Sequence, residues 1–256
     1  TALYLPPPRK VDQQPGKLTF SSGSRPANSA IIARLKHTTN TLLTLTNTAA
    51  KTAWRLGVWS MTTGWPTCAT FYDDRLFFAG AETYPQRLDG SKSSNYTSFA
   101  PSALADGAVA NDNAVSFTLN ADDVNAVQWM VPNEKGLLVG TGRGEWVVKP
   151  STLNEAITPT NISAKTSTRH GSAPVAPVAA GKAVLFMQRA KRRLREMAYV
   201  FEADGFKAPD MTLLASHATL GGINRLAYQE QPQAVVWGVR GDGVLAGFTY
   251  ERDQDV

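Results

Sequence analysis

The segment Gly136-Leu137-Leu138-Val139-Gly140-Thr141-Gly142-Arg143-Gly144-Glu145-Trp146-Val147-Val148-Lys149 decides the class of fold. It joins a continuous apolar run, Gly136–Gly140, to a second strand-like run, Glu145–Lys149, through a turn at Gly142-Arg143-Gly144. A continuous apolar run of about four to eight residues between turn residues is typical of a strand buried on both faces. The segment therefore predicts a β-hairpin inside a chain that is built from strands.

The same order of strand, turn, apolar run, turn and strand occurs four times along the chain. The first unit consists of Thr67–Tyr72, a turn at Asp73-Asp74, Leu76–Gly80 and Gln86–Ser91. The second consists of Asn125–Val131, Gly136–Gly140 and Glu145–Lys149. The third consists of Pro174–Ala179, Ala183–Met187 and Arg193–Phe201. The fourth consists of Ile223–Gln229, Ala234–Val239 and Val244–Tyr250.

A unit that recurs roughly every 50 residues and contains three or four strands is typical of a propeller blade. A single blade cannot bury both of its faces, so its neighbours must cover them. We expect an all-β, propeller-like domain of three- to four-stranded antiparallel blades over residues 54–256. The repeat units are expected near 60–105, 106–160, 161–215 and 216–256. A β-sandwich is the rival, because it also combines short strands with regular turns.

Composition agrees with an all-β domain. Of 256 residues, 43% are apolar and only 18% are charged, which permits a sizeable core and favours strands over long helices. Cys68 is the single cysteine, which excludes a disulfide framework and fits a reducing cytoplasm. No segment approaches the roughly 20 apolar residues of a membrane-spanning helix. The chain starts at Thr1 and runs into Leu-Pro-Pro-Pro, so we expect a processed chain or a piece of a longer one.

Positive charge is concentrated near the start of the chain, although the net charge is only +5. Asp12 is the one acidic residue among the first 60, against eight lysines and arginines. We expect residues 1–53 to form a basic extended arm or small subdomain, with a short helix at 30–36 and a strand at 41–47. Such an arm contacts nucleic acid or an acidic partner, or is simply a solvated basic segment.

Catalytic and metal-binding motifs are not recognisable. The histidines His37, His170 and His217 are far apart in the sequence, and we expect His170 and His217 to be structural or on the surface. The acidic pairs Asp73-Asp74 and Asp122-Asp123 suit turns better than cation sites. The segment Gly140–Gly144 lacks the Gly-Lys-Ser/Thr ending of a phosphate-binding loop. We expect no enzymatic activity, no metal ion and no cofactor.

The basic run Arg189-Ala190-Lys191-Arg192-Arg193-Leu194-Arg195 is the sharpest local feature. Its positive side chains are candidates for contact with DNA phosphates or with an acidic subunit, and a solvated turn is the plain alternative. On a strand, Lys191, Arg193 and Arg195 would share one face. The candidate contact residues are therefore Arg189, Lys191, Arg192, Arg193 and Arg195. Of the six tryptophans, three lie on predicted strands, where packing in the core is the usual role, and a sugar-binding platform is the alternative: Trp129, Trp146 and Trp237.

Dispersed motifs over residues 54–256 resemble a known family. They are Trp54–Ser60, Gly64-Trp65-Pro66, Phe71–Gly80, Pro85, Ser91, Asn95-Tyr96, Phe99, Leu137–Thr141, Gly144-Glu145-Trp146, Ile157-Thr158-Pro159, His170-Gly171-Ser172, Arg193–Glu196, Tyr228-Gln229, Pro232, Trp237 and Asp242-Gly243. In these segments the chain resembles the tail nozzle proteins, or tail tubular protein B, of short-tailed bacteriophages. The first 50 residues match less clearly.

The resemblance implies a structural protein of the virion, made in the cytoplasm of the host bacterium. It implies a homohexameric tube that meets the adaptor and the fibres, retains the genome and passes double-stranded DNA during ejection. Members of the family are usually much longer than this chain, which leaves open an incomplete set of blades. Two alternatives to this interpretation are a carbohydrate- or receptor-binding tail module and a sialidase-like enzyme. The Ser-x-Asp-x-Gly-x-x-Trp turn that is usual in sialidase-like propellers is missing.

Overall fold

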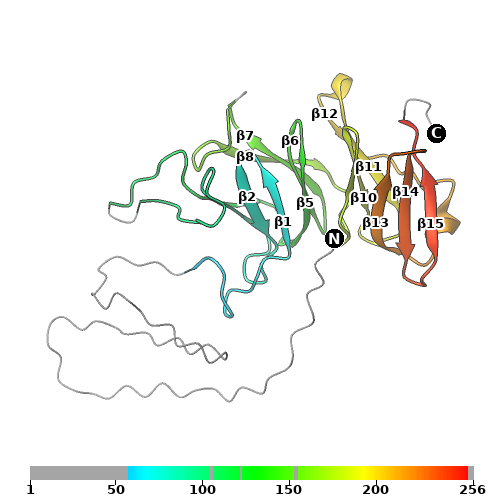
Figure 1. Ribbon diagram of the computed structural model, residues 1–256, viewed down its shortest axis with the longest axis horizontal. Helices are drawn as coiled ribbons and strands as arrows, with labels where there is room; N and C mark the ends of the chain where they lie inside the picture. Colours follow the sequence, from blue (N-terminus) through cyan, green and yellow to red (C-terminus); the bar gives the residue numbers. More distant parts are fainter. Residues whose placement is uncertain (1–56, 104–105, 122, 153–154, 253–256) are drawn as a thin grey trace, which may run out of the picture. The chain divides into compact units, whose positions relative to one another are not determined.

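The computed structural model describes residues 57–252, except 104–105, 122 and 153–154. The basic arm expected at 1–53, with its helix and strand, lies outside the described residues, as do His37, Trp54 and Asp122. The described chain is all-β and contains four antiparallel sheets whose strands follow one another in sequence (Figure 1). The all-β prediction is confirmed.

Each sheet is an up-and-down meander. The first contains β1 (Cys68–Tyr72), β2 (Arg75–Ala79), β3 (Arg87–Gly90) and β4 (Val115–Thr118). The second contains β5 (Val127–Asn133), β6 (Gly136–Thr141), β7 (Glu145–Pro150) and β8 (Ile162–Thr168). The third contains β9 (Val178–Ala180), β10 (Ala183–Met187), β11 (Leu194–Val200) and β12 (Gly205–Lys207). The fourth contains β13 (Ile223–Gln229), β14 (Val235–Arg240) and β15 (Leu245–Thr249). Two short 3₁₀ helices, η1 (Phe201–Ala203) and η2 (Ser216–Thr219), lie in the connections.

The first three strands of every sheet coincide with the strands predicted from the sequence, within a few residues at their ends, apart from the shorter β9. The fourth strands, β4, β8 and β12, are not among the predicted ones. β12 is only three residues long, β8 is rich in Ser and Thr, and a long connection separates β4 from β3. None of them contains the continuous apolar run on which the prediction rests.

The turn at Asp73-Asp74 shows how the sequence sets the register of β1 and β2. Both residues have positive φ, 54° and 56°, as a tight two-residue hairpin turn requires, and Asp tolerates that conformation better than most residues. The turn places Tyr72 opposite Arg75 and Cys68 opposite Ala79. The carboxylate of Asp73 accepts the backbone N–H of Ile157 at 2.5 Å, so the turn also contacts the chain next to the second sheet. The prediction of a turn here is confirmed.

Apolar side chains pack the sheets against one another in chain order. One core cluster joins the first and second sheets, another joins the second and third, and the remaining one joins the third and fourth. Along β6, Leu137 and Val139 contact the first sheet while Leu138 contacts the third. The alternation of side chains along a strand explains why a continuous apolar run is needed there.

Strand β10 repeats this arrangement one sheet further on. Its side chains Val184 and Phe186 belong to the cluster shared with the second sheet, and Leu185 and Met187 to the cluster shared with the fourth. All five residues of β10 are buried. The second and third sheets are therefore covered on both faces.

Candidate functional site

The basic run forms the turn between β10 and β11. Arg189, Arg192 and Arg193 are exposed, and Lys191 is half-buried with a φ of 61°. The ammonium of Lys191 donates to Asn224 Oδ1 at 2.9 Å. Arg193 forms an ion pair with Asp210, in which Nη1 and Oδ2 are 3.3 Å apart. Two of the five predicted contact residues, Arg189 and Arg192, are thus exposed, and in the described structure their side chains form no hydrogen bond or ion pair with another side chain.

Arg195 does not belong to the exposed basic surface. Its side chain lies within the strand β11 and is only 8% exposed. Its Nε donates to Gln188 Oε1 at 3.0 Å, and its Nη1 donates to the carbonyl oxygen of Ala208 at 2.6 Å. Lys191, Arg193 and Arg195 would share one face only on a strand, and in the structure β11 begins at Leu194 while Lys191 lies in the turn.

Two neighbouring segments bring further arginines close to the turn between β10 and β11. The backbone N–H of Arg189 donates to Gly171 O at 2.9 Å, so the segment that carries Arg169 lies against the turn. On its other side, Gly171 lies so close to Gly142 that a Cβ at position 171 would be 2.6 Å from Gly142 O. Gly142 precedes Arg143, which is 70% exposed and pairs with Asp123 at 2.5 Å.

We call Arg143, Arg169, Arg189 and Arg192 the basic surface. Sequence reasoning missed Arg143 and Arg169 because they come from separate connections, β6–β7 and β8–β9. A weak signal exists, since each lies within two residues of a glycine in a predicted turn or loop. Only the folded backbone shows that these turns adjoin.

A buried carboxylate holds two of these turns together. Glu145 is fully buried at the start of β7, and Oε2 accepts the hydroxyl of Thr168 at 2.6 Å. Oε1 accepts the hydroxyl of Ser172 at 2.9 Å, and Oε2 also accepts the backbone N–H of His170 at 3.3 Å. Hydrogen bonds to a buried carboxylate offset its loss of hydration. Glu145 therefore fixes the path of the chain on which Arg169 lies.

His170 itself adds little positive charge to the basic surface. Its partial burial, and then the neighbouring charge of Arg195, lower the pKa of the imidazole below its usual value. The ring is consequently mostly neutral near pH 7. His217 is exposed in η2. Both histidines are structural or surface residues, as expected.

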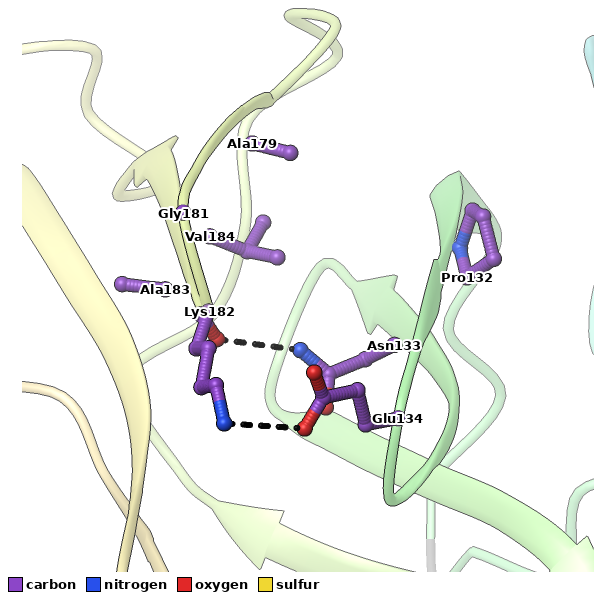
Figure 2. Close-up of a pocket in the computed structure, with 8 residues that line it drawn as sticks. All are labelled: Pro132, Asn133, Glu134, Ala179, Gly181, Lys182, Ala183 and Val184. Atoms are coloured by element: carbon purple, nitrogen blue, oxygen red, sulfur yellow. Dashed lines mark hydrogen bonds and ion pairs between the residues drawn. The ribbon is translucent and has the colours of Figure 1, made fainter.

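A cavity of about 250 Å³ lies between two hairpin turns, one from the second sheet and one from the third (Figure 2). The amide of Asn133 donates to the carbonyl oxygen of Lys182 at 3.1 Å, and the ammonium of Lys182 lies 3.5 Å from Glu134 Oε2. Figure 2 shows both interactions running across the gap from one turn to the other. Because these polar groups bind each other, they join the two sheets.

A larger cavity, of about 540 Å³, is lined by residues of β1, of β5 and of the segment that precedes β9. Cys68 lines it, and burial raises the pKa of the thiol to about 11, so the thiol is protonated at neutral pH. Trp129 also lines the cavity, and its buried Nε1 has no hydrogen-bond partner among the described residues. This lining offers no activated nucleophile.

The tryptophans divide between core and surface. Trp129 and Trp146 are buried, 2% and 8% exposed, so neither can stack on a sugar. Trp59 packs edge-on against Phe78 and Phe99, with ring centroids 4.9 Å apart in each pair. Trp65 is 60% exposed. A sugar platform built on Trp146 is therefore excluded, while Trp65 is accessible.

Within the described part of the chain, no group of three or more His, Cys, Asp or Glu side chains is placed to hold a metal ion. None of the helices described there is both long enough and apolar enough to cross a bilayer.

Comparisons with known proteins identify no family. No family model matches the chain, and no curated protein does. Among solved structures, the chain is similar to a luciferin-regenerating enzyme at 10% sequence identity, over 69% of this chain and 73% of that one, with a TM-score of 0.24. A TM-score this low supports no inference about fold or activity.

Proposed function

We propose that this protein is a structural component of a bacteriophage tail, of the nozzle or tail tube type, that assembles into an oligomeric conduit for DNA. The observation that carries the proposal is the basic surface, in which arginines from three adjoining turns lie on a stack of β-sheets. The resemblance of residues 54–256 to tail nozzle proteins supports the same function. In this proposal the protein works through assembly and electrostatic contact and catalyses no reaction.

The proposed architecture is an arrangement of propeller-like blades. Each described sheet is a meander, and neighbouring sheets in the chain bury apolar faces against each other, as blades do. The proposed assembly is a homohexamer in the virion, made in the host cytoplasm, in contact with adaptor and fibre proteins. Such a conduit needs a surface that DNA passes without sequence-specific binding, and arginines that meet phosphates provide that kind of contact.

Removing the basic surface is expected to weaken the binding of duplex DNA and to make it less sensitive to salt. The variant is Arg169→Ala, Arg189→Ala and Arg192→Ala, at three exposed positions. Each lost phosphate contact is expected to reduce the slope of log K against log salt by about one, so the slope should fall by about three. Fluorescence anisotropy with a labelled duplex at several salt concentrations measures both effects.

A variant with the same change of charge is the control. Lys149, Lys165 and Lys207 are exposed on β7, β8 and β12, and none of them belongs to the basic surface. Their replacement by alanine is expected to leave most of the DNA affinity and slope intact. Equal losses in the two triple variants would contradict the assignment of the basic surface, since the binding would then follow only the net charge.

The second candidate is a carbohydrate- or receptor-binding tail module. The observation that favours it is Trp65, whose large ring is 60% exposed next to the first sheet. An exposed indole can stack on a sugar ring, because it offers a flat apolar face beside a polar N–H. The basic surface has no role in that function, so DNA binding separates the two candidates.

A further inference from the structure

One face of the fourth sheet is apolar and is not covered by any part of the chain that the structure describes. Strand β14 contains a continuous apolar run, as β6 and β10 do, yet only Val236 and its neighbours on one face belong to a core cluster. On the opposite face, Val239 is 40% exposed and Leu245 59%. These two residues lie opposite each other in the register of β14 and β15, and Trp237 lies on the same face.

The ring of Trp237 lies along the surface of this face. It lies over Gly247, where a Cβ would be 3.0 Å from the ring atom Cζ3, and its Nε1 donates to Gln229 Oε1 at 3.0 Å. The indole is therefore held flat on the sheet with its polar atom satisfied. We call Trp237, Val239 and Leu245 the outer face of the fourth sheet. Exposed apolar surface of this kind is typical of contact surfaces.

The first sheet also exposes apolar side chains on the side away from the second sheet. There Trp59 and Phe99 cover Phe78, but Phe71 is 61% exposed and Tyr96 41%. The rings of Phe71 and Tyr96 pack edge to face with centroids 5.2 Å apart. We call these two residues the aromatic patch of the first sheet.

Opposite charges border the two surfaces. Arg225 is exposed and lies opposite Val239 in the register of β13 and β14, at the border of the outer face. Asp74 is exposed beside the aromatic patch, where the hydroxyl of Tyr96 donates to Oδ1 at 2.9 Å. Hydrogen bonds from Ser94 and Tyr96 lower the pKa of Asp74, so its carboxylate is charged at neutral pH. The two borders are therefore electrostatically complementary.

We infer that copies of this chain associate head to tail, with the outer face of the fourth sheet of one copy on the aromatic patch of the first sheet of the next. Within one copy, the four sheets stack on one another in chain order. The proposed contact extends this stacking from one copy to the next. It also places Arg225 of one copy on the side of the interface where the next copy has Asp74. A contact between two different surfaces produces a ring or a filament, as heterologous interfaces do. The inference deepens the proposed conduit and rests on it for its biological purpose.

The test uses two variants that each remove one surface, Leu245→Glu and Phe71→Glu. Each is expected to weaken self-association at least about 100-fold, because a charge would be buried at a contact of two apolar surfaces. When the two variants are mixed, one intact outer face meets one intact aromatic patch, so the mixture is expected to form dimers and nothing larger. Analytical ultracentrifugation over a range of concentrations measures all three samples.

Leu214→Glu and Phe201→Glu are matched controls, since these residues lie outside both surfaces and are 96% and 84% exposed. Both control variants should associate like the wild type. If Leu245→Glu or Phe71→Glu lowers the melting temperature, Val239→Glu or Ala69→Glu replaces it on the same face. A wild-type protein that stays monomeric overturns the inference, as does association unaffected by either variant or a mixture that does not dimerise. If the wild type associates and the mixture dimerises as expected, but the wild type does not bind DNA, the proposed function is contradicted and this interface is not.

Discussion

Replacing Arg75 with methionine is expected to lower the free energy of unfolding by about 4 kcal/mol, a large fraction of the stability of a typical domain. Arg75 lies on β2 and is only 2% exposed. Its guanidinium donates to backbone carbonyl oxygens that come from three distant parts of the chain. They are Ile157 O at 3.0 Å, Ser91 O at 2.7 Å, Asn113 O at 2.6 Å and Asn111 O at 2.7 Å.

The size of the loss in stability follows from the carbonyl groups that Arg75→Met would leave without a donor. Methionine fills similar space but donates nothing, so several buried or partly buried carbonyl oxygens would lose their partner. Each such loss costs about 1–3 kcal/mol, although the costs do not add fully because the connection between β3 and β4 can relax. Arg75→Lys is expected to recover only part of the loss, because an ammonium cannot reach carbonyls arranged around a planar fork.

Urea denaturation measures the prediction directly. Arg169→Met is the matched control, because Arg169 is exposed and its replacement should change stability by less than about 0.5 kcal/mol. A loss for Arg75→Met no larger than that of the control would show that Arg75 does not organise this part of the structure.

Gly140→Ala is expected to cost about 3 kcal/mol, at the upper end of the range for an overpacked core. Gly140 lies on β6 directly opposite Trp129 on β5, and the indole covers it. A Cβ at position 140 would overlap the ring atoms Cε2 and Cζ2 of Trp129. The indole cannot move aside easily, because it is 2% exposed and packs against Phe186 of the third sheet with ring centroids 5.5 Å apart.

Gly142→Ala is the control for Gly140→Ala. It lies two residues further along the same segment, and a Cβ at position 142 would be 3.6 Å from its nearest neighbour, Asn125 Oδ1. Urea denaturation should show little change for Gly142→Ala and a clear loss for Gly140→Ala, accompanied by an altered near-ultraviolet circular dichroism spectrum from Trp129. Equal stability of the two variants would contradict the described packing of the second sheet on the third.

Arg75 and Gly140 show where sequence reasoning stops. The apolar runs at Gly136–Gly140 and Ala183–Met187 predict strands, because their pattern is local and matches strands with two covered faces. The role of Arg75 is not predictable in this way, since one of its partners, Ile157, is 82 positions away. In the sequence, Gly140 resembles part of a turn or of a weak phosphate-binding loop. Glycine is required at this position because the indole of Trp129, on another strand, occupies the space that a side chain would need.

The basic surface illustrates the same limit at the candidate site. The run Arg189–Arg195 predicts a concentration of positive charge, and the turn between β10 and β11 exposes part of it. The sequence places Arg195 in the predicted strand Arg193–Phe201 but does not show that its charge turns inward, because the acceptors Gln188 and Ala208 come from other segments. Nor does it show that Gly171 lies against Gly142, which brings Arg169 and Arg143 to the same place.

Light scattering combined with electron microscopy of the purified protein tests the proposed conduit most directly. The proposal predicts a discrete oligomer of one stoichiometry, seen as rings with an open axis. A strictly monomeric protein that binds a glycan tightly, and loses that affinity on Trp65→Ala, would contradict the conduit and support the carbohydrate-binding module.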